Sequence, residues 1–108
     1  MDHTTCIIME MLKEENQMIR RYLVIVDGRV QGVGMRGFCM LQAQQRGLTG
    51  YAKNLNNGMV EIQIQGEETK IDEFLVTVRK GNQFIRVDDM SVKSIPVVEN
   101  EKRFGYGY

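Results

Sequence analysis

The order in which strand-like and helix-like apolar patterns follow one another constrains the fold of this chain more than any other feature. Residues 22–26 are almost continuously apolar and rich in β-branched side chains, and Asp27 and Gly28 end the run. This pattern predicts a central strand buried on both faces. After a glycine-punctuated loop, the apolar spacing predicts a helix over residues 36–46, with Gly47 placed as its C-terminal cap.

The rest of the chain continues the alternation of strand and helix patterns. The clearest helix has apolar residues at i, i+3, i+4 and i+7, and Thr69 with Asp72 predicts a capping box at its start. The remaining elements are predicted in this order: strand 48–55, tight turn 56–58, strand 60–65, helix 71–78, strand 90–93 and strand 104–108.

This order, β-α-β-β-α-β with a short terminal strand, predicts an α+β, ferredoxin-like split βαββαβ sandwich. In that fold two helices cover one face of an antiparallel sheet. A chain of 108 residues suffices for one such domain. We expect residues 21–108 to form it, and residues 1–20 to be an N-terminal extension that is either a short helix or disordered. Since this fold hosts many functions, the element order alone does not choose one.

Composition narrows the classes of partner and cofactor. Lys plus Arg and Asp plus Glu number 14 each, and this balance argues against a nucleic-acid partner. No apolar run approaches the ~20 residues of a membrane span. Cys6 and Cys39 form no disulfide framework, and the single histidine, His3, leaves no metal-ligand spacing. We therefore expect a cytoplasmic monomer without cofactor, bound metal, membrane or nucleic-acid partner.

The loop between the first strand and the first helix carries the chemical information. Residues 28–36 read Gly-Arg-Val-Gln-Gly-Val-Gly-Met-Arg. Two glycines let such a loop aim several backbone N–H groups inward as a nest for an anion, and the helix N-terminus adds positive charge. Arg36 follows at a position where its planar guanidinium can grip two phosphoryl oxygens. The loop predicts a phosphate site.

Gly32, Gly34 and Gly37 also spell the glycine pattern of a dinucleotide site. Such a site needs an acidic residue about 20 positions further on, and residues 52–58 contain none. The chain is also too short for the two-half nucleotide-binding fold. We therefore reject a dinucleotide site on these grounds.

A second motif accompanies the loop. Gly50-Tyr51-Ala52-Lys53-Asn54 runs into the Asn57-Gly58 turn. With both motifs at this interval and in this element order, residues 22–108 resemble the acylphosphatase family, which hydrolyses the carboxyl–phosphate bond of acyl phosphates to carboxylate and inorganic phosphate without a metal.

The resemblance implies a role for each residue that matches the motifs. Arg36 would bind the substrate phosphate, and Asn54 would orient the hydrolytic water. Backbone amides of the loop would complete the phosphate cradle; their residues are Gln31, Gly32, Val33, Gly34 and Met35. The sequence departs from the family pattern at Met35 (usually aromatic), Tyr51 (commonly tryptophan) and Asn57 (commonly aspartate).

Two other functions remain open at this point. The same cradle could bind an acyl phosphate, carbamoyl phosphate or free phosphate without turnover, as a sensor or a domain of a larger maturation enzyme. RNA-recognition modules share the element order, but their third strand stacks bases on aromatic rings. Here residues 59–65 place Glu61, Gln63 and Gln65 there instead, which argues against RNA.

Overall fold

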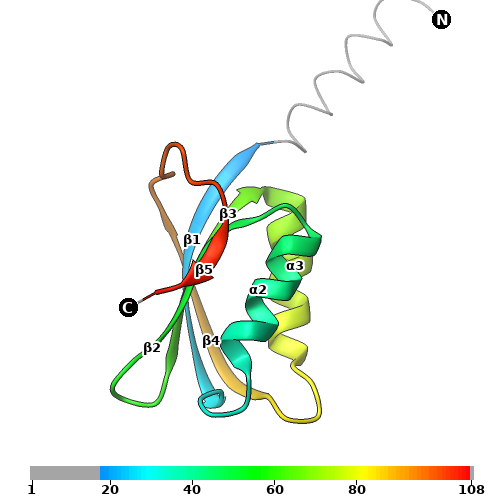
Figure 1. The fold of residues 1–108 in the computed structure, drawn as a ribbon, viewed down its shortest axis with the longest axis vertical. Helices are drawn as coiled ribbons and strands as arrows, with labels where there is room; N and C mark the ends of the chain where they lie inside the picture. Colours follow the sequence, from blue (N-terminus) through cyan, green and yellow to red (C-terminus); the bar gives the residue numbers. More distant parts are fainter. Residues whose placement is uncertain (1–17, 108) are drawn as a thin grey trace, which may run out of the picture.

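The computed structural model describes residues 18–107, in which two helices cover one face of a five-stranded sheet (Figure 1). The elements follow the predicted order, which confirms the ferredoxin-like α+β fold. They are β1 (Ile19–Arg29), α2 (Met35–Gln45), β2 (Thr49–Asn54), β3 (Val60–Glu67), α3 (Glu68–Lys80), β4 (Arg86–Ile95) and β5 (Phe104–Tyr106). β1 begins inside the segment expected to be an extension, and the rest of that segment, residues 1–17, lies outside the described residues.

The sheet is mixed rather than wholly antiparallel. Its strand order is β4-β1-β3-β2-β5, and β1, β2, β3 and β4 pair antiparallel. β5 instead runs parallel to β2, with Tyr106 opposite Ala52. Because β4 and β5 lie at opposite edges of the sheet, the segment between them must cross the sheet. The end of the sheet at which this segment arrives makes β5 run parallel to β2.

The crossing segment, residues 96–103, is tied to the sheet face that the helices leave open. Arg21 of β1 is only 2% exposed, and its Nη1 donates to Glu101 Oε1 at 2.8 Å. Its other side-chain bonds reach Gln63 Oε1 at 2.9 Å and Gln65 Oε1 at 3.1 Å. Gln65 in turn pairs with the backbone N–H and C=O of Val98. These bonds hold the crossing segment over β1 and β3.

β1 occupies the predicted central position, but the prediction that both its faces are buried is wrong. Val24 and Val26 face the helices and are fully buried, whereas Leu23 and Ile25 are half-buried. The reason is that both helices lie on one side of the sheet (Figure 1). On the other side the crossing segment gives only partial cover.

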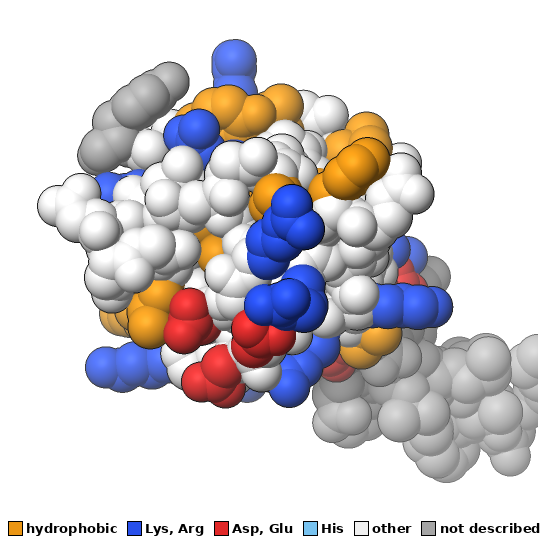
Figure 2. All heavy atoms as spheres, turned by 90° about the horizontal axis from the view of Figure 1, so that it is seen from below, with side chains coloured by type: hydrophobic (Ala, Val, Ile, Leu, Met, Phe, Trp, Pro, Cys, Tyr) orange, Lys and Arg blue, Asp and Glu red, His pale blue; other side chains and the backbone are white. Residues whose placement is uncertain are grey.

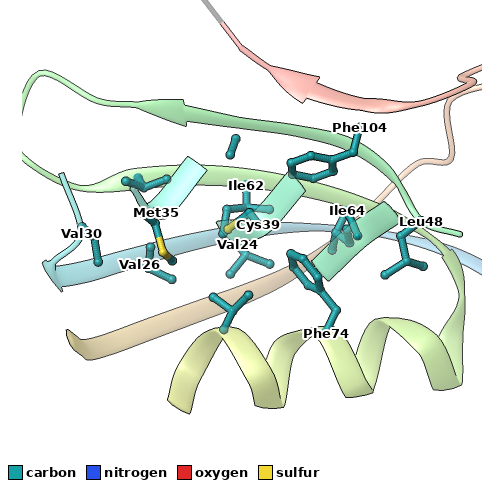
Figure 3. Packing of buried hydrophobic residues seen from close by; sticks show 14 of the residues in the cluster. Val24, Val26, Val30, Met35, Cys39, Leu48, Ile62, Ile64, Phe74 and Phe104 are labelled. Atoms are coloured by element: carbon teal, nitrogen blue, oxygen red, sulfur yellow. The ribbon is translucent and has the colours of Figure 1, made fainter. Parts of the chain in front are cut away.

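The core lies between the sheet and the two helices (Figure 3). The spacing of Ile71, Phe74, Leu75 and Val78 predicted α3; the structure buries all of them except Leu75, which is half-buried at the edge of the core. α2 buries Met35, Cys39 and Ala43. These three side chains pack against the inner face of the sheet and so hold the start of α2 in place. The position of Arg36, the residue after Met35, is held with it.

The predicted capping box of α3 is wrong. β3 runs directly into α3, so the helix begins at Glu68 and Thr69 already lies in its first turn. The Thr69 hydroxyl donates to Glu67 Oε1 at 2.7 Å instead of capping the helix. No connecting loop exists in which Thr69 could take the cap position.

Candidate active site

The connection from β1 to α2 is built around two glycines in the left-handed region. Gly32 has φ 73° and Gly34, the residue that precedes α2, has φ 82°. A Cβ at either position would meet nothing within 4 Å, so the backbone conformation, not a lack of space, favours glycine here. No side chain caps α2 and no acidic residue lies in its first turn, so the helix N-terminus is open to an anion.

A pocket of about 130 Å³ opens beside this connection. It brings together Arg36 and Asn54, the two side chains that the sequence singled out, from α2 and from the end of β2. The residues that line it are Val30, Gly32, Gly34, Met35, Arg36, Gly37, Asn54 and Tyr106. Of the predicted site residues, only Gln31 and Val33 do not line it.

Arg36 is the cation of this pocket and lies in the first turn of α2. Within residues 18–107 no carboxylate pairs with it; instead its guanidinium carbon lies 4.9 Å above the centre of the Tyr106 ring. Its charge is therefore not neutralised by a neighbour. Other Lys and Arg side chains are scattered over this loop end of the molecule, with Asp and Glu gathered toward one side (Figure 2).

Asn54 is the last residue of β2 and is paired with Val60 of β3. The tight turn that follows is held by another asparagine, because Asn57 Oδ1 accepts a bond from the Met59 N–H at 3.0 Å. The Asn54 side chain forms no hydrogen bond to other described residues and is exposed at the pocket. Its amide is therefore available to a ligand or a water.

Gln31 joins the two halves of the pocket. Its side-chain Nε2 donates to the carbonyl oxygens of Leu55 at 2.7 Å and Met59 at 2.8 Å. These two residues close the β2–β3 turn through the bond from Leu55 N–H to Met59 C=O. The Gln31 side chain thus fixes the position of the hairpin that carries Asn54, a role that the sequence pattern did not reveal.

The three departures from the family pattern have separate structural roles. Met35 is 2% exposed, so its side chain packs in the core. Tyr51 lies on β2 outside the pocket lining; its hydroxyl donates to Glu61 Oε2 at 2.6 Å, and burial together with this bond raises the pKa of Tyr51 to about 12. Asn57 holds the turn. Of these three side chains, Met35 alone belongs to a pocket-lining residue.

Val30, Gly37 and Tyr106 line the pocket but were not among the predicted site residues, and of these Tyr106 alone brings a polar side chain. The alternation of residues 104–108 predicts sheet packing, and Phe104 does pack in the core. Two positions later, Tyr106 points to the same face of the sheet but beyond the core, where it reaches Arg36. Alternation along β5 places Tyr106 on the same face as Phe104. The contact between Tyr106 and Arg36 depends instead on the path by which the chain crosses the sheet to reach β5.

Other reactive groups of the described residues do not fit the chemistry of the pocket. Cys39 is buried, and its burial raises the pKa of the thiol to about 12, so it is not a thiolate nucleophile at neutral pH. Residues 18–107 contain no group of three His, Cys, Asp or Glu side chains that could hold a metal ion. The pocket therefore offers backbone amides, one guanidinium and one carboxamide.

Comparison with known proteins agrees with this chemistry. The family model of the acylphosphatases matches residues 22–106. The chain belongs to the acylphosphatase family. The acylphosphatase of Clostridium beijerinckii is 48% identical over 88 residues, which cover 82% of this chain and 98% of that protein. The acylphosphatase of Bacillus subtilis is 42% identical over 88 residues, covering 82% of this chain and 97% of that protein.

Solved acylphosphatase structures have the same fold. A crystal structure of the Bacillus subtilis acylphosphatase superimposes with a TM-score of 0.78 over 84% of this chain and 100% of that chain. Full-length HypF, solved in a phosphate- and nucleotide-bound form, matches with 30% identity and a TM-score of 0.75. That match covers 85% of this chain but 12% of HypF.

As a member of this family, the chain is an enzyme that hydrolyses acyl phosphates, and its substrate is a small molecule. None of the described helices is both long enough and apolar enough to cross a membrane. In this pocket residues of the two family motifs meet.

Proposed function

We propose that Arg36 and the backbone N–H groups of residues 31–35 hold the phosphoryl group of the acyl phosphate, while Asn54 orients the attacking water. The observation that supports these roles is the convergence of the two-glycine loop, Arg36 and Asn54 on one small pocket. A pocket of about 130 Å³ has the volume of roughly four water molecules.

The chemistry of an acyl phosphate explains why so few groups suffice. Its leaving group is a carboxylate, whose acid has a pKa of roughly 4 to 5, so no general acid is needed for departure. Phosphoryl transfer passes through a loose transition state with charge spread over the equatorial oxygens. Fixed amides and a guanidinium stabilise that charge without rearrangement.

Asn54 acts by position, because a carboxamide is not a base. Its side-chain oxygen accepts a hydrogen bond from the water and holds the water oxygen in line with the bond to be broken. The water oxygen forms a bond to phosphorus as the bond from phosphorus to the acyl oxygen breaks, and the carboxylate leaves with the electron pair. The water's proton passes to a phosphate oxygen or to solvent.

The test is the hydrolysis of benzoyl phosphate and acetyl phosphate in the presence of a chelator. Arg36→Ala should lower kcat/KM by at least ~10²-fold and weaken inhibition by inorganic phosphate, because it removes a charge that binds both ground and transition states. Asn54→Ala should lower kcat by ~10² to 10³-fold and leave phosphate inhibition unchanged, because its partner is the water.

Two control variants match these changes. Arg79→Ala removes an exposed arginine of α3, and Asn56→Ala removes an exposed asparagine of the turn; neither lines the pocket. Both should hydrolyse substrate at the rate of the unmodified chain. Full activity in Arg36→Ala, or an equal loss in Asn54→Ala and Asn56→Ala, would contradict the proposed roles.

The alternative that the sequence left open, a phosphate-binding module without turnover, is not favoured, because the relatives that match most of the chain are acylphosphatases.

The setting of the enzyme completes the proposal. The equal numbers of acidic and basic residues argue against a nucleic-acid partner, and two cysteines without a disulfide framework suit the cytoplasm. The enzyme would act there as a monomer without a cofactor. Its catalytic domain would begin with β1 at Ile19, two residues earlier than expected, and the residues before it would form an extension.

A further inference from the structure

The position of Tyr106 is determined by three separate contacts. Tyr106 pairs with Ala52, two residues before Asn54, in the parallel ladder between β5 and β2. The next residue, Gly107, donates its N–H to the Ala52 carbonyl at 2.9 Å. On the other side, a methyl group at Gly37 would lie 3.3 Å from the Tyr106 hydroxyl, so this hydroxyl lies close against the first turns of α2. The ring therefore bridges the strand of Asn54 and the helix of Arg36.

The contact between the Tyr106 ring and the Arg36 guanidinium is of the kind that a phosphate-binding arginine needs, because it restrains the side chain without neutralising its charge. An arginine is flexible, and fixing it before the substrate arrives lowers the entropy cost of binding. A carboxylate partner would fix Arg36 but would also occupy its N–H donors and cancel its charge. The Tyr106 ring instead presents its face to the guanidinium, whose carbon lies 4.9 Å from the ring centre, and accepts no hydrogen bond from the N–H groups that phosphoryl oxygens would use.

Tyr106 also provides the accessible apolar surface of the pocket. Val30 and Met35 line the pocket but are 1% and 2% exposed, and the three lining glycines have no side chain. Arg36 and Asn54 are polar. Tyr106 is 40% exposed. The pocket is small, about 130 Å³, and opens to solvent, so the acyl group of a larger substrate would extend along its lining, where Tyr106 is the exposed ring.

We propose that Tyr106 is a positioning and specificity residue. Its ring holds the Arg36 guanidinium ready for phosphate, and its exposed part packs against the acyl group and favours aromatic over short aliphatic acyl phosphates. The proposal rests on the role of Arg36 in phosphate binding. It adds a residue from the last strand to a site whose other side chains come from α2 and β2.

The experiment compares Tyr106→Leu with Tyr106→Phe. The leucine variant keeps apolar volume but removes the ring; it should raise the Ki of inorganic phosphate and the KM of acetyl phosphate about three- to tenfold, the range of a partly exposed cation–π contact. The KM of benzoyl phosphate should rise a further two- to tenfold, because a ring-to-ring contact is lost as well. The phenylalanine variant keeps the ring and should restore all three constants.

The controls separate this proposal from the role of Arg36 and from effects on folding. Phe84→Leu makes the same kind of change at an exposed aromatic that does not line the pocket, and it should leave all three constants unchanged. If Tyr106→Leu is insoluble, Tyr106→Thr replaces it, because threonine suits a strand.

If Tyr106→Leu leaves the Ki of inorganic phosphate unchanged while Arg36→Ala is inactive, the positioning role of Tyr106 is wrong. The phosphate-binding role of Arg36 then stands. An equal rise in KM for both substrates would overturn the specificity for aromatic acyl groups. Normal activity in Arg36→Ala would overturn the basis of both proposals.

Discussion

At the scale of single residues, catalytic geometry depends on side chains that never touch the substrate. Gln31 is the clearest case, because one amide group spans from the phosphate loop to two carbonyls of the β2–β3 turn. In the proposed site the loop holds the phosphoryl group and the hairpin carries Asn54. The Gln31 side chain therefore links the two parts of that site.

Replacing Gln31 should separate binding from catalysis. Gln31→Leu leaves the Leu55 and Met59 carbonyls without this donor, and it should lower the free energy of unfolding by about 1–3 kcal/mol. As the hairpin shifts, kcat should fall by up to ~10²-fold, with a smaller change in phosphate inhibition. Urea denaturation and steady-state kinetics measure the two effects, and Gln44→Leu on the exposed side of α2 is the control. A kcat equal to that of the control would refute the coupling.

The sequence predicted the site residues unequally. The glycine loop pointed to Arg36, and the resemblance to the acylphosphatases pointed to Asn54; both residues lie in motifs that are continuous in the sequence. Tyr106 and the Gln31 side chain depend on contacts between segments far apart in the sequence. A pattern of apolar residues shows which face a residue points to, but not which other element reaches that face.

At the scale of elements, one glycine lets the two strands beside the site pair closely. Gly50 of β2 has φ 135°, and a Cβ there would lie 1.8 Å from the Gln63 carbonyl oxygen of β3. No rearrangement of a side chain relieves this clash, because the obstacle is backbone. The close pairing of β2 with β3 therefore requires glycine at this position.

Gly50→Ala should lower the free energy of unfolding by about 3 kcal/mol or more, from backbone strain and the forced separation of the strands. Gly105→Ala in β5 is the matched control. A Cβ there meets nothing within 4 Å and its φ is not positive, so its stability should change by less than about 1 kcal/mol. Urea unfolding of both variants decides the matter; equal stability of the two would contradict the structural explanation.

The elements themselves were predictable where a pattern is strong and local. α3 was found because most of its apolar residues recur at helical spacing on the face toward the sheet; Val76, which is 69% exposed, lies outside that pattern. The predicted cap at Thr69 failed because a cap needs a loop before the helix, and β3 leaves none. The burial of β1 was overestimated because an apolar run does not show that both helices lie on the same side of the sheet.

At the scale of the whole molecule, the ion pair between Arg21 and Glu101 fixes the path of the segment that leads to β5. It holds residues 96–103 across the open face of the sheet, between β4 at one edge and β5 at the other. The sequence gives no sign of this path, because the residues involved lie 80 positions apart. The parallel pairing of β5 was unpredictable for the same reason.

Breaking this pair should weaken both the fold and the site. Glu101→Ala leaves the Arg21 guanidinium buried with only Gln63 and Gln65 as partners, and should cost about 3 kcal/mol of stability. Glu101→Gln keeps an acceptor oxygen and should cost less. Because β5 loses its anchor, phosphate inhibition should weaken in the alanine variant, as in Tyr106→Leu. Unfolding in urea and the Ki of phosphate test this; an alanine variant as stable as its glutamine counterpart would argue against the anchor.

The position of β5 in the sequence makes the pocket depend on a strand far from its other parts. Loop, helix and hairpin of the pocket lie within residues 28–60, but the aromatic ring beside the guanidinium lies at position 106. Proteolytic trimming that reaches Tyr106 should therefore disturb the pocket even where the other four strands and both helices persist.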